Sequence, residues 1–298
     1  MNQQIHINFP NEISLTIKRE DLIHPFVSGN KFRKLKYNLL QAKAENKETI
    51  LTFGGAFSNH IAAVAFAGKE QGFRTIGIIR GDELFDKIEE NPTLKFAQEN
   101  GMTFEFVSRE EYRNKSEIFF LEKLKDKFGD FYLVPEGGTN ELAVKGCEEI
   151  LTEEDSVFNY VCCAVGTGGT ISGLINSALP NQKILGFPAL KGDFLTDEIR
   201  IFAKKDNWNL ISDYHFGGYG KVNLELIEFI NAFLETNKVP LDPIYTGKMV
   251  FGVIDLIDKK YFPAHSKILL IHTGGLQGIE GMNMKLKQKK LPTLKNND

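Results

Sequence analysis

Short apolar segments rich in β-branched residues alternate with helical patterns over most of the chain, and this alternation constrains the fold more than any other feature. We expect strands at residues 48–55, 74–81, 103–108, 131–138, 158–169, 183–189 and 266–275. We expect helices at residues 59–71, 92–100, 170–179, 223–235 and 247–260. Strands and helices that alternate at this spacing predict a doubly wound, mainly parallel α/β architecture.

Composition and charge exclude several classes of partner. Of the 298 residues, 42% are hydrophobic and 25% are charged, which is typical of a globular protein. The formal net charge of −3 is too small to attract nucleic acid or an anionic membrane surface, so small molecules are the expected partners. The first residues lack the basic start and apolar run that would indicate a signal peptide. No stretch approaches the roughly 20 apolar residues of a membrane span. We therefore expect a cytoplasmic protein.

The three cysteines indicate a structural role. Cys162 and Cys163 are adjacent on a strand that we expect to be buried, and Cys147 is the third. Adjacent cysteines on a buried strand fit reduced thiols better than a disulfide or a metal site. The sequence therefore predicts no bound metal.

Three glycine-rich turns follow expected strands, at Gly54-Gly55, at Gly166 to Gly169 and at Gly274-Gly275. In doubly wound sheets, ligands bind beyond the carboxyl ends of the strands. These turns therefore mark the expected position of a binding site.

The segment GTGGT, residues 166–170, ends a strand and begins a helix. Glycines let the backbone turn tightly and direct several N–H groups at one anion, and the helix dipole strengthens the attraction. Thr167 and Thr170 can add hydroxyl donors. A dinucleotide fingerprint would need glycine where Ile171 stands, and the Gly-Lys-Ser/Thr ending of a Walker loop is absent. A tight turn without any ligand is the remaining alternative to a phosphate-binding loop.

Lys31 follows Ser28, Gly29 and Asn30 in the segment SGNKFRKL. The Gly-Asn pair predicts a turn and a helix start, which places Lys31 in a first helical turn where its positive charge opposes the helix dipole. Such a position favours the neutral amine that imine chemistry requires. The alternative is the solvated face of a basic helix, and we expect Lys34 and Lys36 to lie on that surface.

The segment SNH, residues 58–60, follows the first glycine turn and precedes an apolar helix. Ser58 or Asn59 fits a helix N-cap, and packing or capping is the favoured role of His60. A lysine, a Ser-Asn turn and a phosphate loop are together the parts that hold pyridoxal phosphate. The lysine amine would form an imine with the cofactor, the turn would contact its ring, and the loop would bind its phosphate.

At this point the chain resembles the family of 1-aminocyclopropane-1-carboxylate deaminase and D-cysteine desulfhydrase, a branch of the tryptophan-synthase-β-like, fold type II pyridoxal phosphate enzymes. The resemblance runs in consistent order from about Lys18 to Gly275. The motifs that carry it are SGNKFRKL, GGAFSNH, VPEGGTN, GTGGTISG, GGYGK, YTGKMVFGVIDLI and IHTGG.

The resemblance implies a fold of two doubly wound, mainly parallel domains with the cofactor in the cleft between them. Residues 45–140 would form the small domain, and residues 1–44 together with 141–298 would form the large cofactor-binding domain. A homodimer is usual for the family.

The resemblance also implies roles for particular residues. Lys31 would bear the cofactor, and Asn59 would hydrogen-bond its phenolic oxygen. Ser58 would meet the substrate carboxylate or move a proton. The tyrosines of GGYGK and PIYTGK would face the substrate, as catalytic or positioning groups, and these are Tyr219 and Tyr245. The remaining cofactor-binding residues would be Gly166, Thr167, Gly168, Gly169 and Thr170 at the phosphate and Thr246 at the pyridine nitrogen.

The chain departs from the family pattern at positions that concern the substrate. Phe57 replaces the usual Gln, and Ala62-Ala63 replace a polar pair, so polar groups are lost near the expected carboxylate site. Thr246 stands where the deaminases have Glu and the desulfhydrases have Thr. A hydroxyl would hydrogen-bond only a neutral pyridine and give a milder electron sink, which suffices when the leaving group is a thiolate.

We therefore expect a pyridoxal phosphate lyase or deaminase that converts a small amino acid to a 2-oxo acid and ammonia. An amino-acid racemase or a β-replacement enzyme on the same fold is one alternative. A non-catalytic relative that binds a small molecule is another. The lysine-rich residues 284–298 are expected to form a solvated tail.

Overall fold

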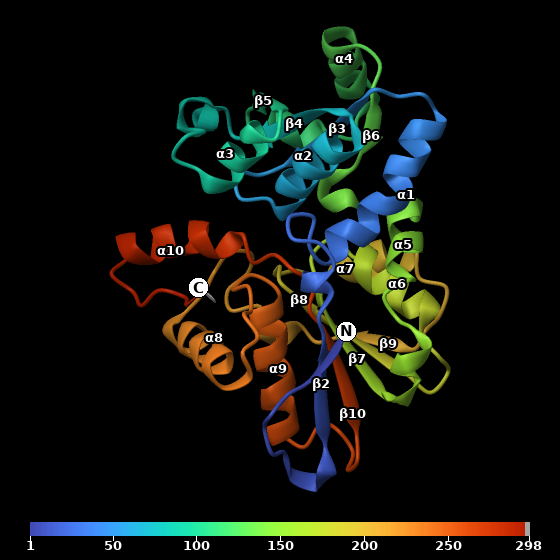
Figure 1. Cartoon of the computed structure of the whole chain (residues 1–298), viewed down its shortest axis with the longest axis vertical. Coiled ribbons are helices and arrows are strands. Elements are labelled where there is room, and N and C mark those ends of the chain that lie inside the picture. Colours follow the sequence, from blue (N-terminus) through green and yellow to red (C-terminus); the bar gives the residue numbers. More distant parts are fainter. Residues whose placement is uncertain (296–298) are drawn as a thin grey trace.

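The computed structural model describes residues 1–295 and places its strands in two sheets (Figure 1). The first sheet has four parallel strands in the order β5 (Met102–Val107), β4 (Arg74–Arg80), β3 (Thr49–Gly54), β6 (Tyr132–Val134). The second has six strands in the order β1 (Asn2–Gln4), β2 (Ser14–Lys18), β10 (Lys267–Ile271), β7 (Tyr160–Val165), β8 (Lys183–Pro188), β9 (Trp208–Leu210). Only β1 runs antiparallel to its neighbour among these described strands, so the predicted mainly parallel α/β fold is confirmed.

Helices cover both faces of each sheet, as expected for parallel strands that are buried on two sides. The four-stranded sheet has α2 (Asn59–Gln71) and α3 (Pro92–Glu99) on one face and α4 (Ile118–Phe128) on the other. The six-stranded sheet packs α8 (Leu224–Asn237), α9 (Thr246–Asp258) and α10 (Gly278–Gln288) on one face. Its other face packs α5 (Glu141–Cys147), α6 (Gly169–Ser177) and α7 (Leu195–Arg200).

Helix α1 (Asn30–Ala44) is shared between the two halves of the structure. Its residues Leu35 and Ala42 belong to the core of the four-stranded sheet. It also packs against α5, and Figure 1 shows it running from beside the four-stranded sheet to the near end of the six-stranded sheet. A side chain on α1 can therefore face groups from both halves.

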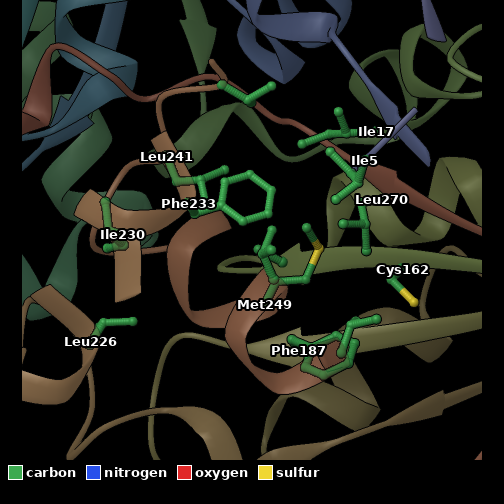
Figure 2. Packing of buried hydrophobic residues seen from close by; sticks show 14 of the residues in the cluster. Ile5, Ile17, Cys162, Phe187, Leu226, Ile230, Phe233, Leu241, Met249 and Leu270 are labelled. Carbon is green, nitrogen blue, oxygen red and sulfur yellow. The ribbon is translucent and has the colours of Figure 1, made fainter. Parts of the chain in front are cut away.

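The largest core cluster lies between the six-stranded sheet and helices α8 to α10. Figure 2 shows one inward side chain from each of four neighbouring strands, Ile17, Leu270, Cys162 and Phe187, facing Met249 of α9. Side chains alternate across a strand, so the adjacent Cys163 points to the opposite face and joins the cluster under α6. The three cysteines are buried free thiols, as predicted.

The seven predicted strands and five predicted helices are present, with ends shifted by a few residues. The largest shifts are in the strands predicted at 158–169, 266–275 and 131–138, which each end four residues early, the last of them as Tyr132–Val134. The backbone then turns through Gly137 and Gly138, which both have positive φ angles. The division into domains at residues 45 and 140 stays a prediction, although the strands of the smaller sheet all lie between residues 49 and 134. None of the helices within residues 1–295 is long and apolar enough to cross a bilayer.

The prediction of a solvated tail after residue 284 is wrong for its described part. Residues 284–288 belong to α10, and Leu286 and Leu294 are buried in the main core. Asn283 exchanges two hydrogen bonds with the backbone of Leu294, which folds the chain back after the helix. The last three residues lie outside the described part of the chain.

Candidate active site

A cavity of about 1170 Å³ lies between the two sheets, at the carboxyl ends of β3, β7 and β10. All three predicted glycine-rich turns contribute to its wall, through Gly55, Gly166, Gly168 and Gly274. Groups from both halves of the structure therefore meet in one place, as the strand-end rule for α/β sheets predicts.

Gly29 fixes where α1 begins. Its φ of +61° lies in the region that favours glycine, and a Cβ there would lie 2.0 Å from the carbonyl oxygen of Thr273. The next residue, Asn30, donates its backbone N–H to the same carbonyl at 3.2 Å. Only glycine allows the backbone at position 29 to come this close to Thr273, so the start of α1 packs directly against the turn that follows β10. The following residue, Lys31, is thereby placed at the cavity wall.

Lys31 has the properties of a reactive amine. Its Nζ donates one hydrogen bond, to the carbonyl of Gly137 at 3.3 Å. Burial, together with the nearby charge of Lys34, lowers the pKa of Lys31 from 10.5 to about 7. Much of the amine is therefore neutral near pH 7, which is the form that attacks a carbonyl.

Lys34 corrects the prediction that it would lie on the surface. It is one turn from Lys31 on the same helix and is only 2% exposed. Its Nζ donates to the carbonyl of Gly137 at 3.1 Å and to the hydroxyls of Thr139 at 2.9 Å and Thr167 at 3.4 Å. Within residues 1–295 it contacts no carboxylate, and burial lowers its pKa. By contrast, Lys36 is at the surface and pairs with Glu149 at 2.7 Å, as predicted.

The glycine loop 166–170 leads from β7 into α6. Gly168 is the N-cap of α6 and has a φ of +83°, which favours glycine there. The first N–H groups of α6 have no partner within the helix and point into the loop. Thr170 accepts a hydrogen bond from Asn30 at 2.8 Å, and Thr167 shares one with Thr139 at 2.6 Å. Gly169 is buried behind this wall, where a Cβ would lie 3.1 Å from the Lys34 ammonium nitrogen.

This corner of the cavity fits a phosphate group. A buried ammonium without a carboxylate partner is costly unless an anion binds beside it. The N-terminus of α6 supplies N–H donors and a positive dipole end to the same place. The threonine hydroxyls can add two further donors. The loop predicted from sequence and the unpredicted Lys34 thus form a single anion site.

The SNH turn brings further polar groups to the cavity wall. Ser58 is the N-cap of α2, where its hydroxyl accepts the N–H of Ile61 at 3.4 Å. The Oδ1 atom of Asn59 is buried without a hydrogen-bond partner in the described residues. His60 is buried and shares a hydrogen bond with Thr52 at 2.8 Å. Burial and the charges of Lys31 and Lys34 hold the pKa of His60 well below 6.5, so this ring is neutral.

Tyr219 and Tyr245 line the cavity together, with ring centroids 6.1 Å apart. Burial raises the pKa of both phenols above 10.0, that of Tyr245 well above it. Both are therefore protonated at neutral pH and can donate hydrogen bonds, but neither is a base until a ligand changes its surroundings.

Thr246 does not line the cavity, although it was predicted to contact the cofactor. It is fully buried at the start of α9, and its hydroxyl donates to the Asp242 carboxylate at 2.5 Å. The same oxygen accepts the N–H of Asp242 at 3.0 Å. Its single proton is thus directed at Asp242. The buried Ala62 and Ala63 are also away from the cavity, whereas Phe57 lines it.

Most of the predicted site residues share this one cavity, and sequence reasoning missed several of its polar groups. The wall includes Lys31, Ser58, Asn59, Gly166, Thr167, Gly168, Thr170, Tyr219 and Tyr245. Among the missed groups are Lys34, Thr139 and Glu136, which accepts from Tyr112 at 2.8 Å and pairs with Lys115 at 3.3 Å. The motif VPEGGTN contains two of these, and its polar residues beside glycines after a strand were the available signal. A nucleophilic amine, an anion site and phenol donors in one cleft suit covalent chemistry on a phosphorylated aldehyde cofactor.

Comparison with known proteins agrees with this geometry. Residues 7–274 match the family model described as pyridoxal-phosphate dependent enzyme. A protein of Thermotoga maritima, provisionally named 1-aminocyclopropane-1-carboxylate deaminase, is 30% identical over 92% of each chain. The bifunctional, mitochondrial D-cysteine desulfhydrase/1-aminocyclopropane-1-carboxylate deaminase of Arabidopsis thaliana is 30% identical over 91% of this chain and 74% of its own. A solved structure described as an ACC deaminase homologue superposes with a TM-score of 0.81, at 28% identity, over 97% of this chain and 93% of that one.

Proposed function

The chain belongs to the pyridoxal-phosphate dependent enzymes, in the group of 1-aminocyclopropane-1-carboxylate deaminases and D-cysteine desulfhydrases, and on that premise we propose that it deaminates a small amino acid. The products would be ammonia and a 2-oxo acid. The observation that carries the proposal is the pairing of Lys31, whose pKa is about 7, with the buried cation of Lys34 one helical turn away. The first suits attachment of an aldehyde, and the second suits the phosphate of the same molecule.

The residues present would hold pyridoxal phosphate as follows. Lys31 would attach to its aldehyde carbon. Lys34, Thr167, Thr170 and the N–H groups at the start of α6 would bind its phosphate. Asn59, whose Oδ1 is buried and unpartnered in the described structure, would hydrogen-bond the ring.

When bound, pyridoxal phosphate withdraws electrons from the bonds around the α-carbon of an amino acid. The protein then decides which bond breaks, by orienting the substrate. The N-terminus of α2 at Ser58 presents N–H groups that suit the substrate carboxylate. Lys31 Nζ would carry the α-proton, because its pKa near 7 allows both loss and gain of a proton at neutral pH. Tyr219 and Tyr245 would donate to the departing group through their hydroxyls.

A test of substrate choice follows from the chemistry of the two leaving groups. We expect kcat/KM for D-cysteine to exceed that for 1-aminocyclopropane-1-carboxylate by at least about tenfold, a barrier difference of about 1.4 kcal/mol. A thiolate is a better leaving group than a ring carbon, so its departure needs less stabilisation of the electrons left at the α-carbon. Release of ammonia from the two compounds, measured side by side, decides the question. Equal or faster release from the cyclopropane compound would show this expectation to be wrong.

A second test concerns the phosphate loop. Asp and Asn at position 168 differ in charge but not in size, and Asn tolerates a positive φ better than most residues. We expect Gly168→Asp to bind pyridoxal phosphate more weakly than Gly168→Asn by at least about 2 kcal/mol, because the carboxylate repels the phosphate. Fluorescence titration of the two apoproteins measures the difference. Equal affinity in the two variants would mean that the phosphate binds elsewhere.

We also propose that the protein forms a homodimer and is located in the cytoplasm. Light scattering of the purified protein, with and without cofactor, measures the first. Fractionation of the cells that produce it measures the second.

A further inference from the structure

A second group of basic side chains lies on the cavity wall away from the phosphate corner, and we call Lys221, Lys285 and Lys289 the lysine cluster. Lys221 follows the loop that carries Tyr219. Lys285 and Lys289 are four residues apart at the C-terminal end of α10. Two segments that are distant in the sequence thus bring three cations to one part of the cleft.

The lysine cluster has no carboxylate partner among the ion pairs of residues 1–295, whereas other basic residues of the wall do. Lys115 pairs with Glu136 at 3.3 Å, and Arg109 pairs with Glu83 at 2.7 Å. Partial burial and the charges of Lys289 and Lys221 together lower the pKa of Lys285, in agreement with their proximity. Lys289 is the C-cap residue of α10, one turn after Lys285, so their like charges repel each other. An anion bound between them would offset this repulsion.

The position of α10 connects the lysine cluster to the proposed reaction centre. The helix begins at Gly278, where a Cβ would lie 3.7 Å from Asn59 Oδ1. One turn later a Cβ on Gly281 would lie 2.6 Å from the ring of Phe57. Lys285 follows, with its Nζ 4.3 Å from the centroid of the same ring. The helical rise from Gly278 to Lys285 is about 10 Å. A substrate side chain of a few atoms, together with the length of the Lys285 side chain, can span this distance.

The size and the lining of the cleft also suit a longer substrate. Its volume of about 1170 Å³ exceeds the roughly 300–1,000 Å³ of common ligand sites, so it has room for more than a cofactor and a three-carbon amino acid. The aromatic ring of Phe57 supplies an apolar surface between Asn59 and Lys285, against which the stem of a side chain can pack.

We propose that the lysine cluster binds an anionic group at the far end of the substrate's side chain. The preferred substrates are then amino acids that carry a carboxylate, sulfonate or phosphate beyond the β-carbon. This inference rests on the proposed function, because it assumes that the substrate is an amino acid held at Lys31 and Asn59.

The test uses two thioethers of nearly equal size, S-carboxymethylcysteine and S-(2-hydroxyethyl)cysteine, each as both enantiomers. The holoenzyme is expected to show the higher kcat/KM for ammonia release from the carboxymethyl compound. That preference should fall about fivefold in Lys285→Gln and about twenty-fivefold in the double variant Lys285→Gln/Lys289→Gln, as for partly exposed charge pairs. Lys285→Arg should retain it, and added salt should weaken it.

Lys287→Gln is the matched control, because Lys287 lies on the same helix but not on the cavity wall. It removes the same charge and is expected to leave the preference unchanged. An equal fall in Lys287→Gln and Lys285→Gln, or no preference for the anionic compound in the holoenzyme, would overturn the inference.

Calorimetric binding to Lys31→Ala supplied with pyridoxal phosphate separates this inference from the proposed function. Tighter binding of the carboxymethyl compound, without ammonia release from any amino acid by the wild-type enzyme, would refute the proposed function and support the lysine cluster as a binding site. Turnover of D-cysteine without tighter binding of the carboxymethyl compound would support the proposed function and refute the inference.

Discussion

Replacement of Lys31 by alanine is expected to lower kcat by about a thousandfold or more, because the amine both holds the cofactor and carries the α-proton. The variant should fold normally, since the side chain of Lys31 is only partly buried and makes one hydrogen bond. The purified wild-type protein should absorb near the edge of the visible range and lose that band on reduction with borohydride. Peptide mapping should then find the reduced adduct on Lys31.

Lys36→Ala is the matched control for Lys31→Ala. Lys36 lies on the same helix and pairs with Glu149 at the surface, where such pairs contribute little. Its loss should leave both the absorption band and kcat unchanged. An adduct on a lysine other than Lys31, or a retained band and turnover in Lys31→Ala, would contradict the assignment.

The pKa of about 7 gives the same residue a pH signature. Only the neutral amine attacks an aldehyde, so the rate at which the apoprotein attaches pyridoxal phosphate should rise with pH up to about 7 and then level off. An ordinary lysine with a pKa of 10.5 would instead show a rate that still rises at pH 9. Stopped-flow absorbance between about pH 6 and pH 9 distinguishes the two profiles.

Lys34→Met is expected to have opposite effects on cofactor binding and on the stability of the apoprotein. Loss of the charge should raise the dissociation constant of pyridoxal phosphate by at least about 30-fold, which is about 2 kcal/mol for charge-assisted hydrogen bonds. Without cofactor, the same ammonium is buried without a carboxylate partner in the described structure, so an apolar side chain of similar length should stabilise the apoprotein by about 1 kcal/mol.

Denaturant unfolding of the two apoproteins and titration with cofactor measure the two effects separately. A purely structural role for Lys34 would instead lower the stability of the apoprotein in Lys34→Met and leave cofactor affinity nearly unchanged. Lys34→Arg, which keeps the charge, should retain more of the affinity than Lys34→Met.

Local signals predicted the elements best. The helix α2 follows its N-cap at Ser58 and has the predicted bounds, and α3 begins at Pro92 as predicted. The missed elements include short ones with little local signal, since β1 and β9 have three residues each. The apolar positions of α10 (Ile279, Met282 and Leu286) are spaced at three and four residues within a mostly polar segment. The strand β2 and the helices α4, α5 and α7 were also not predicted.

The predicted site residues are those that lie in contiguous sequence motifs. Lys34 was misjudged because the burial of a lysine in a basic helix depends on what packs against that face. Its partners Gly137 and Thr139 lie about one hundred residues further along the chain. Thr246 was assigned from the family pattern, and its role at the pyridine nitrogen stays a prediction. Its hydroxyl donates to Asp242, only four residues earlier, and this local contact was not predicted. The error at Lys34, by contrast, concerns contacts between distant segments.

The position of β10 has a consequence for biosynthesis. It is the last described strand in chain order, yet it pairs with β2 on one side and β7 on the other. The four-stranded sheet uses contiguous residues and can assemble while the ribosome is still at work, but the larger sheet must wait until residue 271 has emerged. A chain that is terminated early would expose the edges of β2 and β7, which are ready templates for aggregation. Such a chain would also lack Thr273, the residue against which Gly29 holds the start of α1, so only a finished polypeptide can place its reactive amine.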